Sequence, residues 1–314
     1  MASALALLNV HGDRKHMNAQ DGAATSWKDV IRLASEYLQR RGVPDPQVAA
    51  ELLSARLLKC GRGFLAPHMD KTVPEAHLDA MRRAMMRLVK GEPLQYVLGE
   101  WDFRTLTLKC DRRALIPRPE TEELVERALG HLKAVYGGDD APAPFVVDVG
   151  TGSGCIILSI AKEFGKGVFL GTDISAEAVS LARENAALCG MESSVKFAVA
   201  DGLDEFDPES VDVIVSNPPY ITTADCEGLD PRVKDHEPRS ALDGGVSGLD
   251  FYERFVGDAM NVLKPGGALF FEIGDGQGAA LREMFEAYGF SDVKIEQDFA
   301  GHDRYASGRL CLPE

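Results

Sequence analysis

The pattern with the clearest chemical potential is Asn217-Pro218-Pro219-Tyr220, which follows an apolar run. Each proline keeps the residue before it extended, so the carbonyl groups of Asn217 and Pro218 are held outward. The side-chain oxygen of Asn217 and the carbonyl of Pro218 can accept both hydrogens of an amide or aromatic NH₂ group, and Tyr220 can pack against that planar group. The nitrogen is a poor nucleophile, but orientation alone contributes roughly 7–11 kcal/mol in favourable systems. The pattern predicts group transfer to nitrogen without a strong base; the alternative is a rigid turn.

A second pattern, Gly150-Thr151-Gly152-Ser153-Gly154, follows a predicted strand and precedes a helical pattern. Glycines at such a turn let the backbone come close to a ligand. The next predicted strand ends at Asp173, where a carboxylate can accept hydrogen bonds from ribose hydroxyls, and the third ends at Asp201-Gly202, beside the expected adenine edge. Each feature alone also fits a common turn or helix cap. Three in succession predict a nucleoside-containing ligand.

The spacing of the glycines indicates which class of nucleoside-containing ligand the turn would bind. The third glycine comes one residue earlier than in G-x-G-x-x-G, and no G-x-x-x-x-G-K-[ST] occurs, so the patterns for dinucleotides and triphosphates are not matched. The turn resembles the G-x-G-x-G of S-adenosylmethionine-dependent methyltransferases. That resemblance implies S-adenosyl-L-methionine as methyl donor, with S-adenosyl-L-homocysteine as product. The residues it places on the donor are Gly150, Thr151, Gly152, Ser153, Gly154, Asp173, Asp201, Gly202 and Asn217.

The elements that must position these residues fall into two groups. Apolar residues at helical spacing begin near Ser26, Pro46 and Pro74, which predicts a helical domain over 26–92. Period-two alternation then predicts a β-hairpin linker over 93–118. Over 119–314, alternating patterns predict an α/β domain with a doubly wound, mostly parallel sheet. Helical patterns follow the first, second and fifth of the predicted strands, which are Phe145–Val149, Val168–Thr172, Val195–Ala200, Val211–Ser216, Ala268–Ile273, Val293–Gln297 and Arg304–Leu312.

Composition narrows the function classes. The 314 residues are 45% hydrophobic and 26% charged, which is typical of a globular chain. A formal net charge of −15 disfavours bulk nucleic-acid binding. The six cysteines include no C-x-x-C pair, so we expect reduced thiols and no metal site. The apolar run at 4–10 lacks a basic flank and is too short to cross a membrane, so we expect a cytoplasmic protein. We also expect a monomer. Residues 1–25 are expected to be a disordered extension outside the fold.

Four further motifs identify the family that the chain resembles. They are Gly91-Glu92-Pro93-Leu94-Gln95-Tyr96, Leu115-Ile116-Pro117-Arg118-Pro119-Glu120-Thr121-Glu122, Glu237-Pro238-Arg239-Ser240-Ala241-Leu242-Asp243-Gly244-Gly245 and Ala300-Gly301-His302-Asp303-Arg304. With the tetrapeptide and the glycine turn, they resemble the release-factor (protein glutamine-N5) methyltransferases of the PrmC/HemK type. The resemblance runs from about Trp27 to Leu312.

The resemblance implies a class I methyltransferase domain behind a substrate-docking helical domain. It implies methylation of the side-chain amide N5 of the glutamine in the Gly-Gly-Gln motif of peptide-chain release factors. The implied catalytic residues are Asn217, Pro218 and Tyr220, and the residues implied to bind the glutamine are Asn217, Pro218, Pro219 and Tyr220.

Three alternatives stay open at this point. An adenine-N6 methyltransferase acting on nucleic acid would use the same tetrapeptide on a flipped base. A nucleotide-binding oxidoreductase would leave the tetrapeptide unexplained, and a noncatalytic binding protein would leave both halves of the chemistry unused. The roles of Arg118, Glu120 and Glu122 are open as well, because these residues also fit a solvated charge run that opens a helix.

Overall fold

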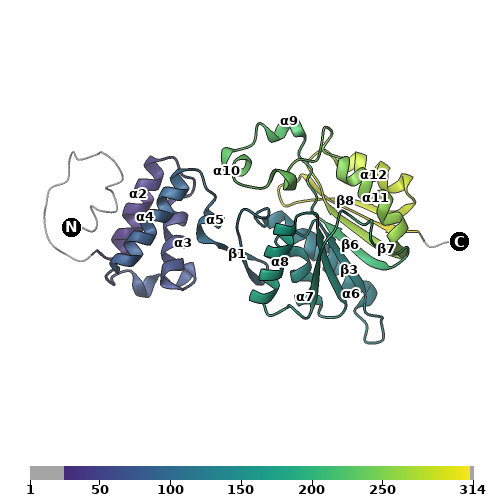
Figure 1. Cartoon of the computed structure of the whole chain (residues 1–314), viewed down its shortest axis with the longest axis horizontal. Coiled ribbons are helices and arrows are strands. Elements are labelled where there is room, and N and C mark those ends of the chain that lie inside the picture. The colour runs from purple at the N-terminus through teal and green to yellow at the C-terminus, as the bar shows by residue number, and fades with distance from the viewer. Residues whose placement is uncertain (1–24, 312–314) are drawn as a thin grey trace. The chain divides into compact units, whose positions relative to one another are not determined.

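The structure is a computed structural model that describes residues 25–311, and its internal contacts divide the chain between Gly99 and Glu100 into two compact units (Figure 1). In the part of the chain that it describes, no helix is long and apolar enough to cross a membrane. The extension predicted over 1–25 lies outside the described residues except for Thr25. That residue is buried, and its carbonyl accepts the N–H of Val73 at 2.9 Å, so Thr25 belongs to the folded helical unit and not to an extension.

The first unit is helical. Ser26 caps its first helix by accepting the N–H of Asp29 at 3.2 Å, and the methionines at 81 and 85 fill its core. The helices are α2 (Trp27–Arg40), α3 (Pro46–Leu58), η1 (Arg62–Phe64), η2 (Ala66–His68), α4 (Glu75–Val89) and α5 (Leu94–Leu98).

Helix α5 stands where the linker was expected to begin. Pro93 precedes it and Gly99, at φ +76°, ends it, while Arg87 donates to the carbonyls of Tyr96 and Val97 at 3.0 and 3.3 Å. The division of the structure therefore falls after Gly99. A five-residue helix is too short to show a helical period in the sequence.

The second unit opens with a hairpin of β1 (Glu100–Phe103) and β2 (Leu106–Lys109), in which Phe103 pairs with Leu106. Its turn residue, Arg104, has φ +50°. The Arg104 side chain donates to both carboxylate oxygens of Glu163 at 2.7 Å, and its N–H donates to Glu122 at 3.0 Å. These bonds fasten the hairpin to the helices of the same unit.

A seven-stranded sheet in the order β5-β4-β3-β6-β7-β9-β8 forms the centre of the unit. Pairing is parallel from β5 to β7 and antiparallel where β9 joins β7 and β8, which confirms the predicted mostly parallel α/β class. The strands are β3 (Phe145–Val149), β4 (Val168–Asp173), β5 (Val195–Val199), β6 (Val211–Ser216), β7 (Leu263–Glu272), β8 (Phe290–Gln297) and β9 (Asp303–Leu310).

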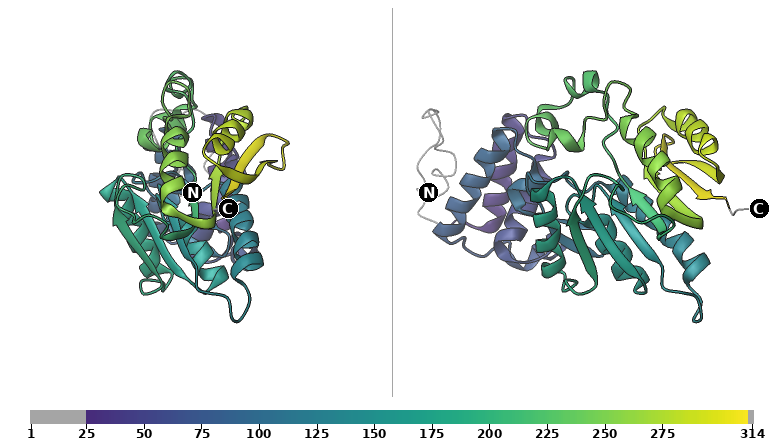
Figure 2. Two further views of the ribbon diagram at one scale, coloured as in Figure 1. Left: turned by 90° about the vertical axis from the view of Figure 1, so that its right-hand side faces the viewer. Right: turned by 45° about the vertical axis from the view of Figure 1, so that its right-hand side comes forward.

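Helices cover both faces of this sheet (Figures 1 and 2). One face packs against α6 (Pro119–Tyr136), α7 (Cys155–Phe164) and α8 (Ala176–Leu188). The other packs against α11 (Asp250–Val262) and α12 (Gly278–Ala287). The segment between β6 and α11, drawn in green, holds α9 (Thr223–Cys226), α10 (Pro231–Lys234) and η3 (Arg239–Ala241) beyond the end of the sheet (Figure 2).

Helices were predicted after the first, second and fifth strands, whereas α11 was not predicted. Its buried residues Tyr252, Phe255 and Val256 have helical spacing. However, Leu249 supplies no side-chain cap, and Leu263 is both the residue after the helix and the first residue of β7. Without a boundary at either end, the pattern merges into the following strand.

A glycine inside β4 should be sensitive to substitution. A Cβ on Gly171 would lie 2.6 Å from the hydroxyl of Thr151 and 2.8 Å from the ring of Phe197. We expect Gly171→Ala to lower the free energy of unfolding by about 1–3 kcal/mol in urea titrations, because overpacking forces neighbours to move. The control is Gly130→Ala in α6, where a Cβ meets nothing within 4 Å, and which should raise stability by about 0.5–1 kcal/mol. Equal stabilities of the two variants would contradict this account.

Candidate active site

A cavity of about 590 Å³ opens at the carboxyl ends of β3, β4 and β6. β3 lies between β4 and β6, so the strand order reverses here, and open α/β sheets bind ligands at this kind of reversal. The volume is that of a small-molecule pocket. Most of the wall comes from residues 112–118, 149–153, 173–175, 200–202 and 216–219, so the two sequence patterns meet in one cavity.

The glycine turn presents backbone to the cavity. Gly150 and Gly152 have φ of +72° and +55°, a region that favours glycine. The N–H of Thr151 donates to the carbonyl of Thr172 at 2.8 Å, which fixes the turn against β4. Gly154 is behind the wall: a Cβ there would lie 3.2–3.3 Å from Ala182, Leu158 and Phe197. Its position accounts for the close packing of α7, and Gly154 is the one glycine of the turn that does not line the cavity.

Asp173 supports the turn and faces the cavity. Its two oxygens accept the N–H groups of Gly152 at 2.9 Å and Ser175 at 2.8 Å. Burial raises the pKa of Asp173, and these two hydrogen bonds oppose the rise. Because each carboxylate oxygen has a further lone pair, the group can hold the loop and still accept from a hydroxyl.

Asp201 and Gly202 are also on the wall, but Asp201 has a protein partner. Arg254 donates to its carboxylate at 2.7 Å and to its carbonyl at 2.9 Å. Gly202 has φ +68°, and a Cβ there would lie 3.0 Å from the ring of Phe255. The Asp201-Gly202 turn therefore packs closely against Phe255, and one oxygen of the Asp201 carboxylate accepts a hydrogen bond from Arg254.

These residues fit an adenosyl ligand. Asp173 ends β4, Asp201 lies two residues after the end of the adjacent β5, and the glycines of the turn offer bare backbone. Sequence reasoning missed Ile174, whose side chain lines the same wall although it is 66% exposed, an unusual exposure for an isoleucine. An exposed aliphatic surface between two carboxylates suits a planar base flanked by a polar sugar.

Asn217, Pro218 and Pro219 line the cavity across from the glycine turn. The Asn217 side chain donates from Nδ2 to the hydroxyl of Thr121 at 3.0 Å, and that hydroxyl donates to Glu272 at 2.7 Å. Tyr220 is outside the lining, and its hydroxyl is 3.4 Å from the other oxygen of Glu272. The structure thus brings three of the four tetrapeptide residues to the wall and turns Tyr220 toward Glu272.

Glu272 was not singled out from the sequence, although it directly follows the apolar residues 268–271 of β7 and is only 1% exposed. Burial raises its pKa to about 7, and the bond from Thr121 and the positive charge of Arg304 oppose that rise. A buried carboxylate beside a cavity is a functional candidate. The missed signal was a glutamate interrupting a run of apolar residues that ends a strand.

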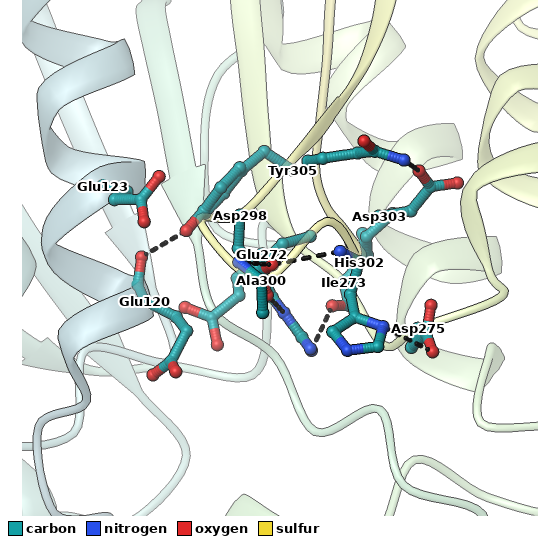
Figure 3. Close-up of polar contacts among 12 residues, drawn as sticks. Glu120, Glu123, Glu272, Ile273, Asp275, Asp298, Ala300, His302, Asp303 and Tyr305 are labelled. Carbon is teal, nitrogen blue, oxygen red and sulfur yellow. Dashed lines mark hydrogen bonds and ion pairs between the residues drawn. The ribbon is translucent and has the colours of Figure 1, made fainter.

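The motif at 300–304 organises the turn between β8 and β9 (Figure 3). Asp298 accepts the N–H groups of Ala300 and His302 at 2.9 and 3.1 Å. Arg304 lies 3.3 Å from Asp298 and donates to the carbonyl of Ile273 at 3.0 Å, one residue after Glu272. The turn therefore holds a cation close to the buried glutamate.

Two of the three charged residues that open α6, Arg118 and Glu122, have protein partners and are not part of a solvated charge run. Arg118 lines the cavity and pairs with Glu237, whose side chain is only 1% exposed and which also accepts the N–H of Ile116 at 2.9 Å. Glu122 accepts the N–H of Arg104. Glu120 accepts the hydroxyl of Tyr305 with its backbone carbonyl at 2.8 Å (Figure 3). Two sequence motifs, 115–122 and 237–245, are thus joined by an ion pair in which the glutamate is buried and the arginine faces the cavity.

Solved structures support the fold. The catalytic domain of hMettl16 in complex with MAT2A 3′UTR hairpin 6 superposes with a TM-score of 0.53 at 18% identity, over 75% of this chain and 83% of that one. A delta-N METTL16 methyltransferase domain gives a TM-score of 0.50 at 20% identity, over 70% and 95%. At these identities the likeness concerns the fold of the methyltransferase domain alone.

Sequence comparisons identify the family. Residues 29–99 match the PrmC N-terminal domain, and residues 139–228 match the methyltransferase small domain. Release factor glutamine methyltransferases of Geobacter sulfurreducens and Bacillus cereus are 40% and 37% identical, covering 90% and 88% of this chain and 96% of each relative. That of Chlorobaculum tepidum is 34% identical over 91% of this chain and 97% of its own length. Because the likeness spans both units and almost the whole of each relative, the chain belongs to the release factor glutamine methyltransferase family.

Proposed function

We propose that the protein transfers a methyl group from S-adenosylmethionine to the side-chain nitrogen of the glutamine in the Gly-Gly-Gln motif of peptide-chain release factors. The observation that carries the proposal is the meeting of Asn217, Pro218 and Pro219 with the glycine turn and Asp173 around one cavity. The relatives that match along nearly the whole chain carry the corresponding name.

The donor would be held by the turn at 150–153, by Asp173 at the ribose and by the Asp201-Gly202 corner at the base. When bound, it supplies an electrophilic methyl group on a sulfonium. Gly154 and Tyr220, expected in the site from the sequence, would act through packing and through Glu272.

The chain's own residues would contribute orientation. The side-chain oxygen of Asn217 and the carbonyl of Pro218 would each accept one N–H of the substrate amide, and Pro219 would keep that carbonyl extended. The nitrogen would then face the donor with little remaining freedom, which is where most of the rate enhancement is expected. The new C–N bond forms at the expense of the C–S bond, and the nitrogen releases one proton to solvent.

The proposal is tested by incubating the enzyme with radiolabelled donor and either recombinant release factor or duplex DNA. We expect label on the glutamine of the factor and none on DNA, because a net charge of −15 opposes nucleic-acid binding. Label on adenine instead would favour the nucleic-acid alternative. We further propose that the protein is cytoplasmic, since release factors act on cytoplasmic ribosomes, and that it is a monomer.

Asn217→Ala should lower the single-turnover rate by about 10²–10³, the usual cost of removing one oriented hydrogen-bonding group from a preorganised site. Donor affinity should stay within about tenfold, because the turn and Asp173 are unchanged. Asn217→Asp keeps an acceptor oxygen and should retain more activity than Ala. Near-normal turnover of the Ala variant would reduce the tetrapeptide to a structural turn.

Asp173→Ala should weaken donor binding by about 10–100-fold in calorimetry, because a hydrogen bond to a charged group contributes about 1.5–3 kcal/mol. The matched control is Asp204→Ala, which removes an exposed carboxylate that pairs with Arg254 but does not itself line the cavity. The control should bind the donor normally. Equal affinities of both variants would remove Asp173 from the donor site and leave it as a support for the turn.

The helical unit is proposed to recognise the release factor. Every residue of the cavity wall lies between Arg112 and Phe255, so a protein of residues 100–314 should bind the donor with unchanged affinity. It should methylate a short Gly-Gly-Gln peptide at the full-length rate and intact release factor more slowly. The cut follows Gly99 so that α5 is removed with the helices that it contacts. Full-rate methylation of the intact factor would disprove docking by this unit.

A further inference from the structure

A chain of hydrogen bonds leads from the buried carboxylate of Glu272 to the wall of the cavity. Glu272 accepts the hydroxyl of Thr121 at 2.7 Å, and Thr121 accepts Nδ2 of Asn217 at 3.0 Å. Glu272 and Thr121 are 1% and 3% exposed. The second carboxylate oxygen of Glu272 lies 3.4 Å from the hydroxyl of Tyr220, so one glutamate reaches both ends of the tetrapeptide.

The direction of each hydrogen bond in this series is set by the carboxylate of Glu272 at its end. An ionised carboxylate only accepts, and a threonine hydroxyl has a single proton. Once Thr121 donates that proton to Glu272, its oxygen can only accept from the neighbour at 3.0 Å. The amide must therefore present its NH₂ to Thr121, and the Oδ1 atom of Asn217 is turned away from Thr121. Asn217 itself lies on the cavity wall.

We propose that Thr121 and Glu272 are positioning residues that orient the Asn217 carboxamide so that its oxygen is available to the substrate NH₂ group. The identity of that substrate rests on the function proposed above, whereas the orientation does not. Without the hydrogen bonds from Asn217 to Thr121 and from Thr121 to Glu272, the carboxamide can rotate by half a turn. It would then present an N–H to the N–H of the substrate, an arrangement in which neither group accepts.

The surroundings of Glu272 favour its charged form against the cost of burial. Arg304 is the nearby cation, and it is held in place by Asp298 and the carbonyl of Ile273. None of the residues 300–304 lines the cavity, so this contact gives their motif a role through Glu272 (Figure 3). The other titratable groups that face Glu272 or act on it are Glu120, Tyr220, Tyr252, Tyr305 and Cys155.

Protonation of Glu272 allows the donor and acceptor roles along this series of hydrogen bonds to reverse. A neutral carboxyl can donate to Thr121, which then donates to Asn217 and draws its oxygen inward. Burial places the pKa of Glu272 at about 7, so the reversal falls within a pH range that the protein can be studied in. The rate of methyl transfer should therefore rise with pH as Glu272 loses its proton.

The orientation is tested without any turnover. In protein labelled with ¹⁵N-asparagine, the side-chain NH₂ signals of Asn217 are identified by their loss in Asn217→Asp. We expect these signals to shift with pH around a midpoint near 7 in the wild type. Glu272→Gln and Thr121→Val should abolish the shift, and Thr121→Ser should retain it. A shift that persists in Glu272→Gln would overturn the proposal.

Single-turnover kinetics give the second readout. Thr121→Val and Glu272→Gln should lose about 10–100-fold in rate, as when outer-shell partners that orient a functional group are removed. KM for the release factor and Kd for the donor should be unchanged, which also shows that both variants fold. Thr121→Ser should restore the rate. The matched control is Ser159→Ala, a buried hydroxyl without a hydrogen-bond partner within residues 25–311, which should behave as wild type.

The two proposals fail differently. Wild-type rates in Thr121→Val and Glu272→Gln would overturn the positioning role while leaving the methyltransferase intact. Absence of methyl transfer to the release factor by the wild type, together with the expected pH-dependent shift at Asn217, would overturn the proposed function and support the orientation of the carboxamide.

Discussion

The parallel pairing of β3 with β4 on one side and β6 on the other is the constraint on which the site depends. Parallel strands end at the same edge of a sheet, and the connections that follow them must diverge where the order reverses. The glycine turn follows β3 directly, Asp173 is the last residue of β4, and the tetrapeptide beginning at Asn217 follows β6. Their proximity is thus a consequence of strand order, and the residues proposed to hold the donor and the glutamine meet at one edge.

Buried carboxylates hold the irregular segments at that edge. Asp148 accepts the hydroxyl of Thr151 below the glycine turn at 2.6 Å, Glu237 ties the segment at 116–118 to the loop before η3, and Glu272 supports the tetrapeptide. A loop cannot complete its hydrogen bonds as a strand does, so acceptors placed behind it fix its shape. Each of these carboxylates is nearly inaccessible, which makes them supports and not ligand contacts.

The buried carboxylates Asp148 and Glu272 make the free energy of unfolding fall as the pH rises. Burial raises the pKa of Asp148 from 3.8 to about 7 and that of Glu272 from 4.5 to about 7. Between those values the folded chain binds protons that the unfolded chain has released, so the contribution of these two groups to the free energy of unfolding falls as pH increases through this window. Precise support of a site is commonly obtained at some expense to stability.

The sequence by itself determined the fold class and the parts of the cavity wall that lie at strand ends, because strand periods, glycine spacing and residues at strand ends are local features. Gly150, Gly152, Asp173 and Asn217 could be placed for that reason. Tertiary structure alone decided which buried residues form hydrogen bonds and ion pairs that support the residues of the cavity wall. Thr121 and Glu272 are 151 positions apart, and Arg118 and Glu237 are 119 apart, so their pairing leaves no periodic trace in the sequence. Likewise, only packing shows that Gly154 lies against Ala182 and Phe197 and that Asp201 has Arg254 as its partner, because these contacts depend on how α7, α8 and α11 settle on the sheet.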